Sequence, residues 1–244
     1  HIGDRRQRQM CIRDSLRLGH AILPWSAGLT VLCLASGLYL GLFVSPVDYQ
    51  QGETVRIMYV HVPSAWMAMF VFSSIAIASA MALIWKHPLA DLIGKASAPV
   101  GAGFTLICLV TGSLWGKPMW GTWWVWDARL TSVLILFFLY LGYIALNNAF
   151  DDPVRGAKAS AVLALVGAVN LPIIKFSVDW WNTLHQPASV TRLDAPAIHS
   201  SMLWPLLLMA LGFTLFYVSI LILRVRSEVA AARIRNLQLV EARK

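Results

Sequence analysis

Six long apolar runs constrain the fold of this chain more than any other feature of its sequence. They lie at Ala21–Val44, Ala65–Trp85, Ala96–Leu114, Leu130–Leu146, Ala159–Val178 and Ser200–Leu223. A helix rises about 1.5 Å per residue, so a run of roughly 20 residues can cross about 30 Å of hydrocarbon. The alternating segments of about ten residues that build a membrane barrel are not found. The sequence predicts an all-α integral membrane protein with six transmembrane helices.

Composition agrees with this fold class and argues against a water-soluble domain. Hydrophobic residues make up 58% of the chain and charged residues 13%, whereas soluble domains have about 45–50% and about 25%. The net charge of +8 is spread over the ends of the apolar runs, which is the distribution that orients a membrane protein. We therefore expect membrane lipid, and no nucleic acid, as the partner of these charges.

Lysine and arginine also predict the orientation. With six spans, one side of the membrane receives both termini and two short loops, and this side has fifteen of the 20 Lys and Arg residues, against five on the other. Positive charge collects on the cytoplasmic side. Both termini are therefore expected inside, with three loops outside.

The chain divides into three regions along its length. Residues 18–224 form the expected six-helix membrane domain, and residues 225–244 form a charged cytoplasmic tail. Residues 1–17 match the rest poorly and receive no functional role here. The outer loops contain most of the unusual side chains, so function is expected on the outer face.

Tryptophan is concentrated in the second outer loop, between the third and fourth spans. Five of the eleven tryptophans of the chain fall within twelve residues, at Trp115, Trp120, Trp123, Trp124 and Trp126. An interfacial aromatic belt would instead scatter one or two over each helix end. Glycine and proline space these residues, as in irregular backbone. An extended aromatic surface of this kind suits a large, flat, apolar ligand with charged edges.

Two outer histidines, His61 and His185, are the natural metal candidates, because imidazole is a usual axial ligand of haem iron. The competing candidate is His199, and an ordinary hydrogen-bonded histidine is the alternative for each. Haem also has two propionates, which suit the planar fork of arginine. Arg56 and Arg129 are the preferred outer arginines, although a local salt bridge of Arg129 with Asp127 is an equal alternative.

The motifs that contain these residues resemble a known family. Trp115–Thr131 (WGKPMWGTWWVWDARLT) resembles the WWD signature of haem-handling proteins, and Tyr59–Trp66 (YVHVPSAW) and Trp180–Pro187 (WWNTLHQP) extend the match. Together they resemble the CcmC family, the haem exporter proteins C of bacterial cytochrome c maturation. The resemblance runs from about Leu18 to the sixth span.

The resemblance implies a cofactor, a site and partners. His61 and His185 match the axial ligands of haem b, and Trp115–Asp127 matches the loop that contacts haem at the periplasmic face of the inner membrane. The family presents haem to the chaperone CcmE, assisted by CcmD, and the ATPase pair CcmA and CcmB then releases the loaded chaperone.

From these residues we predict a haem-binding assembly factor and not an enzyme. The chain has no GxxxxGK[ST] loop for ATP and no CxxCH for covalent haem. A bis-histidine haem b subunit of a quinone-linked oxidoreductase is the main alternative, although such subunits usually hold haem with histidines inside helices. A transporter with an aromatic outer vestibule is a further one.

Overall fold

The structure is a computed structural model that describes residues 2–87, 89–187, 189–192 and 194–242. Within these ranges the regular elements are helices, apart from an isolated bridge between Asp48 and Gly52. The α-helices are α1 (Ile2–Tyr39), α2 (Met58–Trp85), α3 (Ala90–Trp120), α4 (Ala128–Asn148), α5 (Pro153–Gly167), α6 (Asn170–Trp180) and α7 (Ser200–Glu241). A π-helical turn, η1 (Leu40–Val44), continues α1, and a 3-10 helix, η2 (Glu53–Ile57), leads into α2.

The helical character of the predicted fold class and its number of spans are confirmed. Six helical spans of the described chain are long and apolar enough to cross a membrane. They are Arg13–Val44, Glu53–Trp85, Ala90–Trp120, Ala128–Asn148, Pro153–Trp180 and Ser200–Arg235. Each of the six apolar runs lies inside one of these spans, and α7 continues as a single helix into the predicted tail, to Glu241.

The fifth span differs from the prediction, because it is two helices and not one. α5 ends at Gly167 and α6 begins at Asn170. Pro172 explains the break, since proline inside a helix loses the hydrogen bond to the fourth residue before it and clashes with that carbonyl. In the first turn of a new helix, backbone N–H groups have no acceptor within the helix, so a proline there costs no hydrogen bond. Asn170 at the break donates to the Ser132 carbonyl at 2.8 Å and thereby joins α6 to α4.

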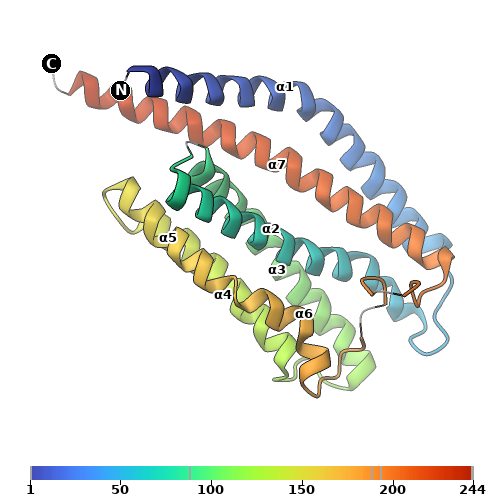
Figure 1. The fold of residues 1–244 in the computed structure, drawn as a ribbon. Coiled ribbons are helices and arrows are strands. Elements are labelled where there is room, and N and C mark those ends of the chain that lie inside the picture. The colour runs from blue at the N-terminus through green and yellow to red at the C-terminus, as the bar shows by residue number, and fades with distance from the viewer. Residues whose placement is uncertain (1, 88, 188, 193, 243–244) are drawn as a thin grey trace.

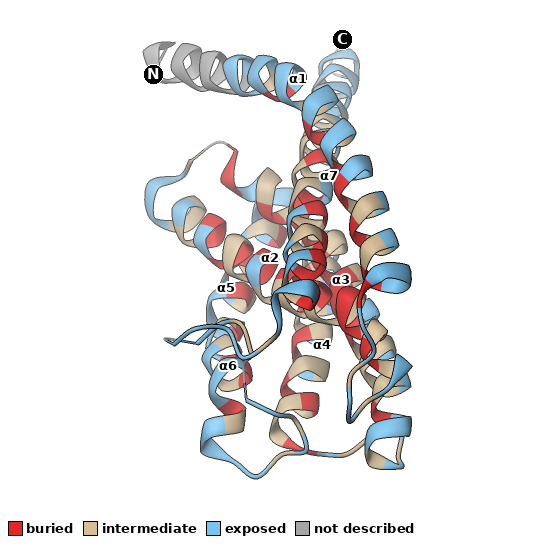
Figure 2. Cartoon of the chain, turned by 90° about the vertical axis from the view of Figure 1, so that its right-hand side faces the viewer, coloured by how far each residue is buried: buried red, intermediate tan, exposed pale blue. Residues whose placement is uncertain are grey.

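The helices pack as a layered bundle with both termini at one end (Figure 1). α1 lies along α7, and α2 and α3 lie between this pair and the group formed by α4, α5 and α6. Buried residues concentrate where the helices face one another (Figure 2). At the centre, the Tyr140 hydroxyl donates to the Ala68 carbonyl at 2.7 Å, and a Cβ at Gly101 would collide with the Tyr140 ring. The small residue lets α3 and α4 approach closely.

Two helices extend further toward the end opposite the termini than hydropathy predicts. α2 already begins at Met58, so His61 is helical although the sequence places it in an outer loop. α3 continues to Trp120, so only residues 121–127 of the tryptophan segment are non-helical. Gly121 ends α3 in the left-handed conformation, at φ 76°, with its N–H bonded to the Lys117 carbonyl at 3.0 Å. Polar and aromatic residues occupy these end turns, and a hydropathy average does not detect helix there.

Candidate functional site

Three segments from distant parts of the sequence meet at the end of the bundle opposite the termini. They are the first turns of α2, the last turns of α3 with residues 121–127, and the described residues between α6 and α7, which are 181–187, 189–192 and 194–199. Each contains one of the three motifs that suggest a haem-handling protein. This end is called the tryptophan end below.

His61 is held in one orientation by α3. Its Nδ1 lies 3.1 Å from both the Cys108 carbonyl and the Thr111 hydroxyl. A carbonyl can only accept, so the neutral ring has its proton on Nδ1 and a free lone pair on Nε2. Histidines that bind metals use this arrangement, in which the second nitrogen donates to a fixed partner. His61 is therefore prepared to coordinate through Nε2.

Space for the His61 ring comes from a glycine. A Cβ at Gly112 would lie 3.0 Å from Cε1 of His61, closer than ordinary contact. Trp115 packs on the same ring edge-to-face, with centroids 5.6 Å apart, and its Nε1 donates to Gln51 at 3.0 Å. Imidazole, glycine and tryptophan thus form one packed unit, which the loop before α2 helps to fix.

His185 lies in the loop after α6 and contacts the second tryptophan of α3. Its ring centroid is 4.9 Å from that of Trp120. Nδ1 of His185 is 3.8 Å from a carboxylate oxygen of Asp127 and, among the described residues, has no hydrogen-bond partner. Burial, reinforced by the charge of Arg129, lowers the pKa of His185 to about 4. The imidazole is therefore neutral at pH 7, which is the form that binds iron.

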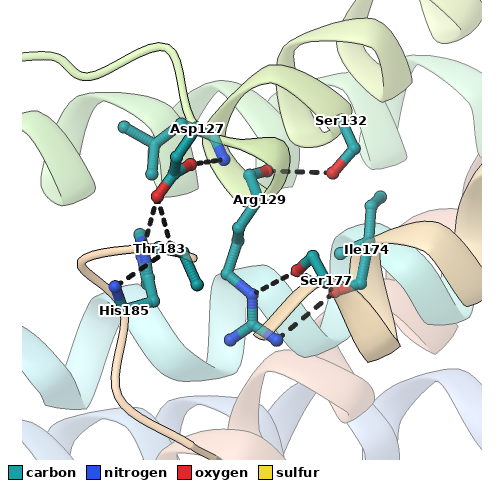
Figure 3. Close-up of polar contacts among 8 residues, drawn as sticks. Asp127, Arg129, Ser132, Ile174, Ser177, Thr183 and His185 are labelled. Atoms are coloured by element: carbon teal, nitrogen blue, oxygen red, sulfur yellow. Dashed lines mark hydrogen bonds and ion pairs between the residues drawn. The ribbon is translucent and has the colours of Figure 1, made fainter. Parts of the chain in front are cut away.

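Asp127 organises this half of the site (Figure 3). One carboxylate oxygen caps α4 by accepting the Leu130 N–H at 2.8 Å, and the other accepts from the Thr183 hydroxyl and faces His185. The expected local pair of Asp127 with Arg129 is wrong. As Figure 3 shows, the Arg129 guanidinium turns toward α6 instead and donates to the Ser177 hydroxyl at 3.1 Å.

Both arginines predicted to hold propionates have backbone partners. Arg129 also donates to the Ile174 carbonyl at 3.3 Å. Arg56 pairs with Glu53 and donates to the carbonyls of Gly41 and Ser45, at 3.0 and 3.1 Å. Carbonyls at a helix end have no partner within the helix, so the positive charge of Arg56 lies at the end of η1. These bonds are structural contacts, and the propionate role of the two arginines stays a prediction.

The five tryptophans do not form one flat surface. Trp123 and Trp126 are 55% and 75% exposed, whereas the other three are half-buried. Trp124 meets Trp126 edge-to-face, with centroids 5.6 Å apart. The Nε1–H of Trp124 is buried and finds no acceptor among the described residues. A buried donor of this kind is costly unless a ligand supplies an acceptor.

The competing histidine has another role. His199 caps α7: its Nδ1 accepts the Ser201 N–H at 3.3 Å and lies 2.8 Å from the Ser201 hydroxyl. A helix cap of this type satisfies an otherwise unpaired N–H group.

Sequence reasoning did not single out three residues that shape the site. Gln51 holds Trp115, Thr111 contacts His61, and Thr183 joins Asp127 to the loop of His185. The position of Thr183 inside the quoted motif Trp180–Pro187 was the one available signal. Gln51 and Thr111 lie in segments whose partners become visible only when the helices are packed.

The donor set of the site fits a flat metal macrocycle. Two neutral imidazoles, tryptophan faces and a buried N–H without a protein acceptor lie at one end of the bundle. The fold and site thus define a multi-pass helical membrane protein with a histidine- and tryptophan-rich site at one end.

Comparison with known proteins identifies the family. The family model of CcmC, Heme exporter protein C, matches residues 11–240, and the chain belongs to this family. Heme exporter protein C of Bradyrhizobium diazoefficiens is 59% identical over 227 residues, which are 93% of this chain and 86% of the relative. The Escherichia coli K12 protein of the same name is 49% identical over 84% of this chain and 82% of its own length. A putative cytochrome c biosynthesis ccmC-like mitochondrial protein of Marchantia polymorpha is 52% identical over 73% of this chain and 75% of its own length.

Proposed function

We propose that this protein binds haem b at the periplasmic face of the bacterial inner membrane and delivers it to the haem chaperone CcmE. His61 and His185 are the axial ligands, and residues 115–127 contact the macrocycle. CcmD assists, and the ATPase subunits CcmA and CcmB act on the loaded chaperone. Relatives at 44–59% identity are named Heme exporter protein C, which supports a role in haem export and cytochrome c maturation.

The observation that argues most strongly for this function is the matched setting of the two imidazoles. Each packs edge-to-face on a tryptophan of α3, His61 on Trp115 and His185 on Trp120. Nδ1 of His61 lies 3.1 Å from the Cys108 carbonyl, and Nδ1 of His185 faces the Asp127 carboxylate at 3.8 Å, which is longer than a hydrogen bond. An acceptor for the second nitrogen orients a metal-binding imidazole and raises its basicity, and the Cys108 carbonyl supplies one to His61. Haem is the cargo in this proposal. Its iron has axial coordination positions, and the two histidines would bind there.

The proposed orientation has both termini in the cytoplasm and the tryptophan end in the periplasm. It follows from the excess of Lys and Arg on the side of the termini and from an even number of spans. The absence of CxxCH from the sequence favours haem held without thioether bonds, which is haem b.

The oxidoreductase alternative gains one feature from the structure. His61 lies inside α2, and helical histidines are typical of such subunits. His185 is in a loop, however, and the family membership favours haem delivery. Histidine position therefore does not separate the two functions, but a transfer assay does.

The test measures haem content, spectrum and transfer in the same membranes. His61→Ala and His185→Ala should each lose or alter bound haem and reduce covalent labelling of CcmE, with the double variant affected most. His199→Ala and His87→Ala serve as controls and should behave like the parent. A changed spectrum in His199→Ala with an unchanged one in His185→Ala would refute the ligand assignment. Bound haem that exchanges electrons with quinone and never labels CcmE would favour the oxidoreductase.

A further inference from the structure

We propose that Thr183 is a positioning residue for His185, fastening the loop of this histidine to the carboxylate that faces its ring. The proposal rests on the proposed function, in which His185 binds haem iron. Thr183 touches neither iron nor macrocycle in this proposal, and it acts through Asp127 and His185.

The Thr183 hydroxyl joins the two segments directly (Figure 3). It donates to the Asp127 carboxylate oxygen that faces the His185 ring, and it accepts the His185 backbone N–H at 3.1 Å. A hydroxyl has one proton to donate and lone pairs to accept with, so both capacities are used. One side chain thereby fixes the main chain of His185 relative to the oxygen that faces its ring.

Asp127 is a rigid anchor for this link. The residue is buried, with 9% exposure, and its second oxygen caps α4 through the Leu130 N–H. It also stands at the N-terminus of a helix, where a negative charge is favourable. The carboxylate is therefore fixed by α4 before the loop docks on it.

The loop itself offers little other restraint near His185. Its described residues, 181–187, 189–192 and 194–199, form no helix or strand. The other bonds within these residues lie further along the chain, from Ala197 N to the Ser189 carbonyl at 2.8 Å, from Arg192 N to the Val190 carbonyl at 3.0 Å and from Arg192 to Asp194 at 3.3 Å. Lys175 of α6 also bonds to Thr191, at 2.9 Å. Holding a backbone residue in place costs conformational entropy. The hydroxyl of Thr183 and the face of Trp120 are the contacts that oppose this cost at His185.

A purely local role accounts for only one of the two bonds. A threonine hydroxyl that accepts the N–H two residues later forms a common turn, which explains the bond to His185. The bond to Asp127 spans 56 residues of sequence and has no such local explanation. A positioning role predicts effects on the coordination of iron, whereas a turn-forming role predicts effects on folding alone.

The test compares variants of the full-length protein in detergent, loaded with haem. Thr183→Val removes the hydroxyl at nearly constant shape, and Thr183→Ser retains it. Thr191→Val, in the same loop but bonded to Lys175, is the matched control. Loss of an outer partner of a metal ligand typically costs 10–100-fold in affinity, so Thr183→Val should bind haem about 10- to 100-fold more weakly. It should also convert low-spin haem partly to high-spin, and free imidazole should restore the low-spin spectrum. Thr183→Ser and Thr191→Val should match the parent.

A second variant serves if Thr183→Val does not accumulate. Asp127→Asn can still cap α4, because asparagine is a good N-cap, but its amide NH₂ cannot accept the Thr183 proton. It should give the same spin change. Parent-like haem affinity and spectrum in Thr183→Val overturn the proposal, as does a loss that neither serine nor imidazole restores. A parent-like spectrum in His185→Ala overturns the ligand assignment itself, so the two failures are distinguishable.

Discussion

Replacing Gly112 by alanine tests the site through His61 without changing a polar group. The new methyl would lie 3.0 Å from Cε1 and 3.5 Å from Nδ1 of His61. Ordinary carbon contacts lie at about 3.5–4.0 Å, so the ring must retreat from α3 by roughly 0.5 Å. Cys108, whose carbonyl accepts from Nδ1, lies one turn earlier on that helix. The same movement away from α3 lengthens and weakens the 3.1 Å hydrogen bond to the Cys108 carbonyl.

The expected result of Gly112→Ala is a loss of haem affinity without a loss of fold. A neutral hydrogen bond contributes about 0.5–1.5 kcal/mol, and alanine is about 1 kcal/mol more favourable than glycine inside a helix. The two terms nearly cancel in the free energy of unfolding. The helix propensity of alanine does not restore the orientation of the His61 ring. Disturbing the hydrogen-bond partner of a metal-binding histidine lowers metal affinity about 10- to 100-fold.

The assay titrates haem into the purified apo-protein and follows the low-spin spectrum, with thermal unfolding measured on the same samples. Gly103→Ala is the matched control, because it lies on α3 and a Cβ there meets nothing within 4 Å. Equal haem affinity in Gly112→Ala and Gly103→Ala would refute the role of Gly112 and of the His61 orientation. Unfolding of Gly112→Ala at clearly lower temperature than the control would show that the clash acts on the fold.

Three further predictions follow from the orientation, the tryptophans and the arginine. Reporter fusions at Asp152 and Thr122 should localise to opposite sides of the membrane, and a cytoplasmic Thr122 fusion would overturn the proposed function. Alanine at one or two tryptophans of residues 115–126 should leave haem bound, since stacking of each aromatic side chain on a flat ring contributes about 1–3 kcal/mol. The same variants should reduce covalent labelling of CcmE. Full labelling with all five tryptophans replaced would show that the segment is only an interfacial belt. Arg129→Lys should lower the free energy of unfolding by about 1–3 kcal/mol through lost bonds to α6, whereas haem loss at unchanged stability would support the propionate role.

The sequence was sufficient for the spans because hydropathy is a local property. Ala65–Trp85 and the other apolar runs lie within the helices that the structure contains. The helix ends were less predictable. The turns from Trp115 to Trp120 and around His61 are helical although their residues are aromatic or polar. The break before Asn170 was not readable from Pro172 alone, because Pro24 and Pro99 lie inside helices that continue without a break.

Side-chain partners were the part that sequence could not supply. The sequence does not tell whether an arginine in an outer loop binds a propionate or a backbone carbonyl. Arg129 finds α6 only because that short helix ends beside α4, and Arg56 finds Gly41 only because η1 ends beside η2. Asp127 and His185 were both candidate residues, but they are 58 positions apart in the sequence. They lie close together because of the loop that Thr183 bonds to Asp127. The residue types of the site were thus predictable, and their pairings were not.

The two halves of the site differ in how they are built, and this difference governs how variants should be interpreted. His61 belongs to a helix, and its partners Cys108, Thr111 and Gly112 lie on one neighbouring helix. Packing of α2 on α3 therefore presets its ring, and changes that affect it must alter that interface. His185 belongs to a loop and reaches its place through side-chain bonds from residues outside the bundle core. Loops with few buried contacts open at lower free energy than packed helices. Substitutions around His185 should consequently change ligation with little change in global stability, so haem spectra will report on this half more sensitively than unfolding measurements will.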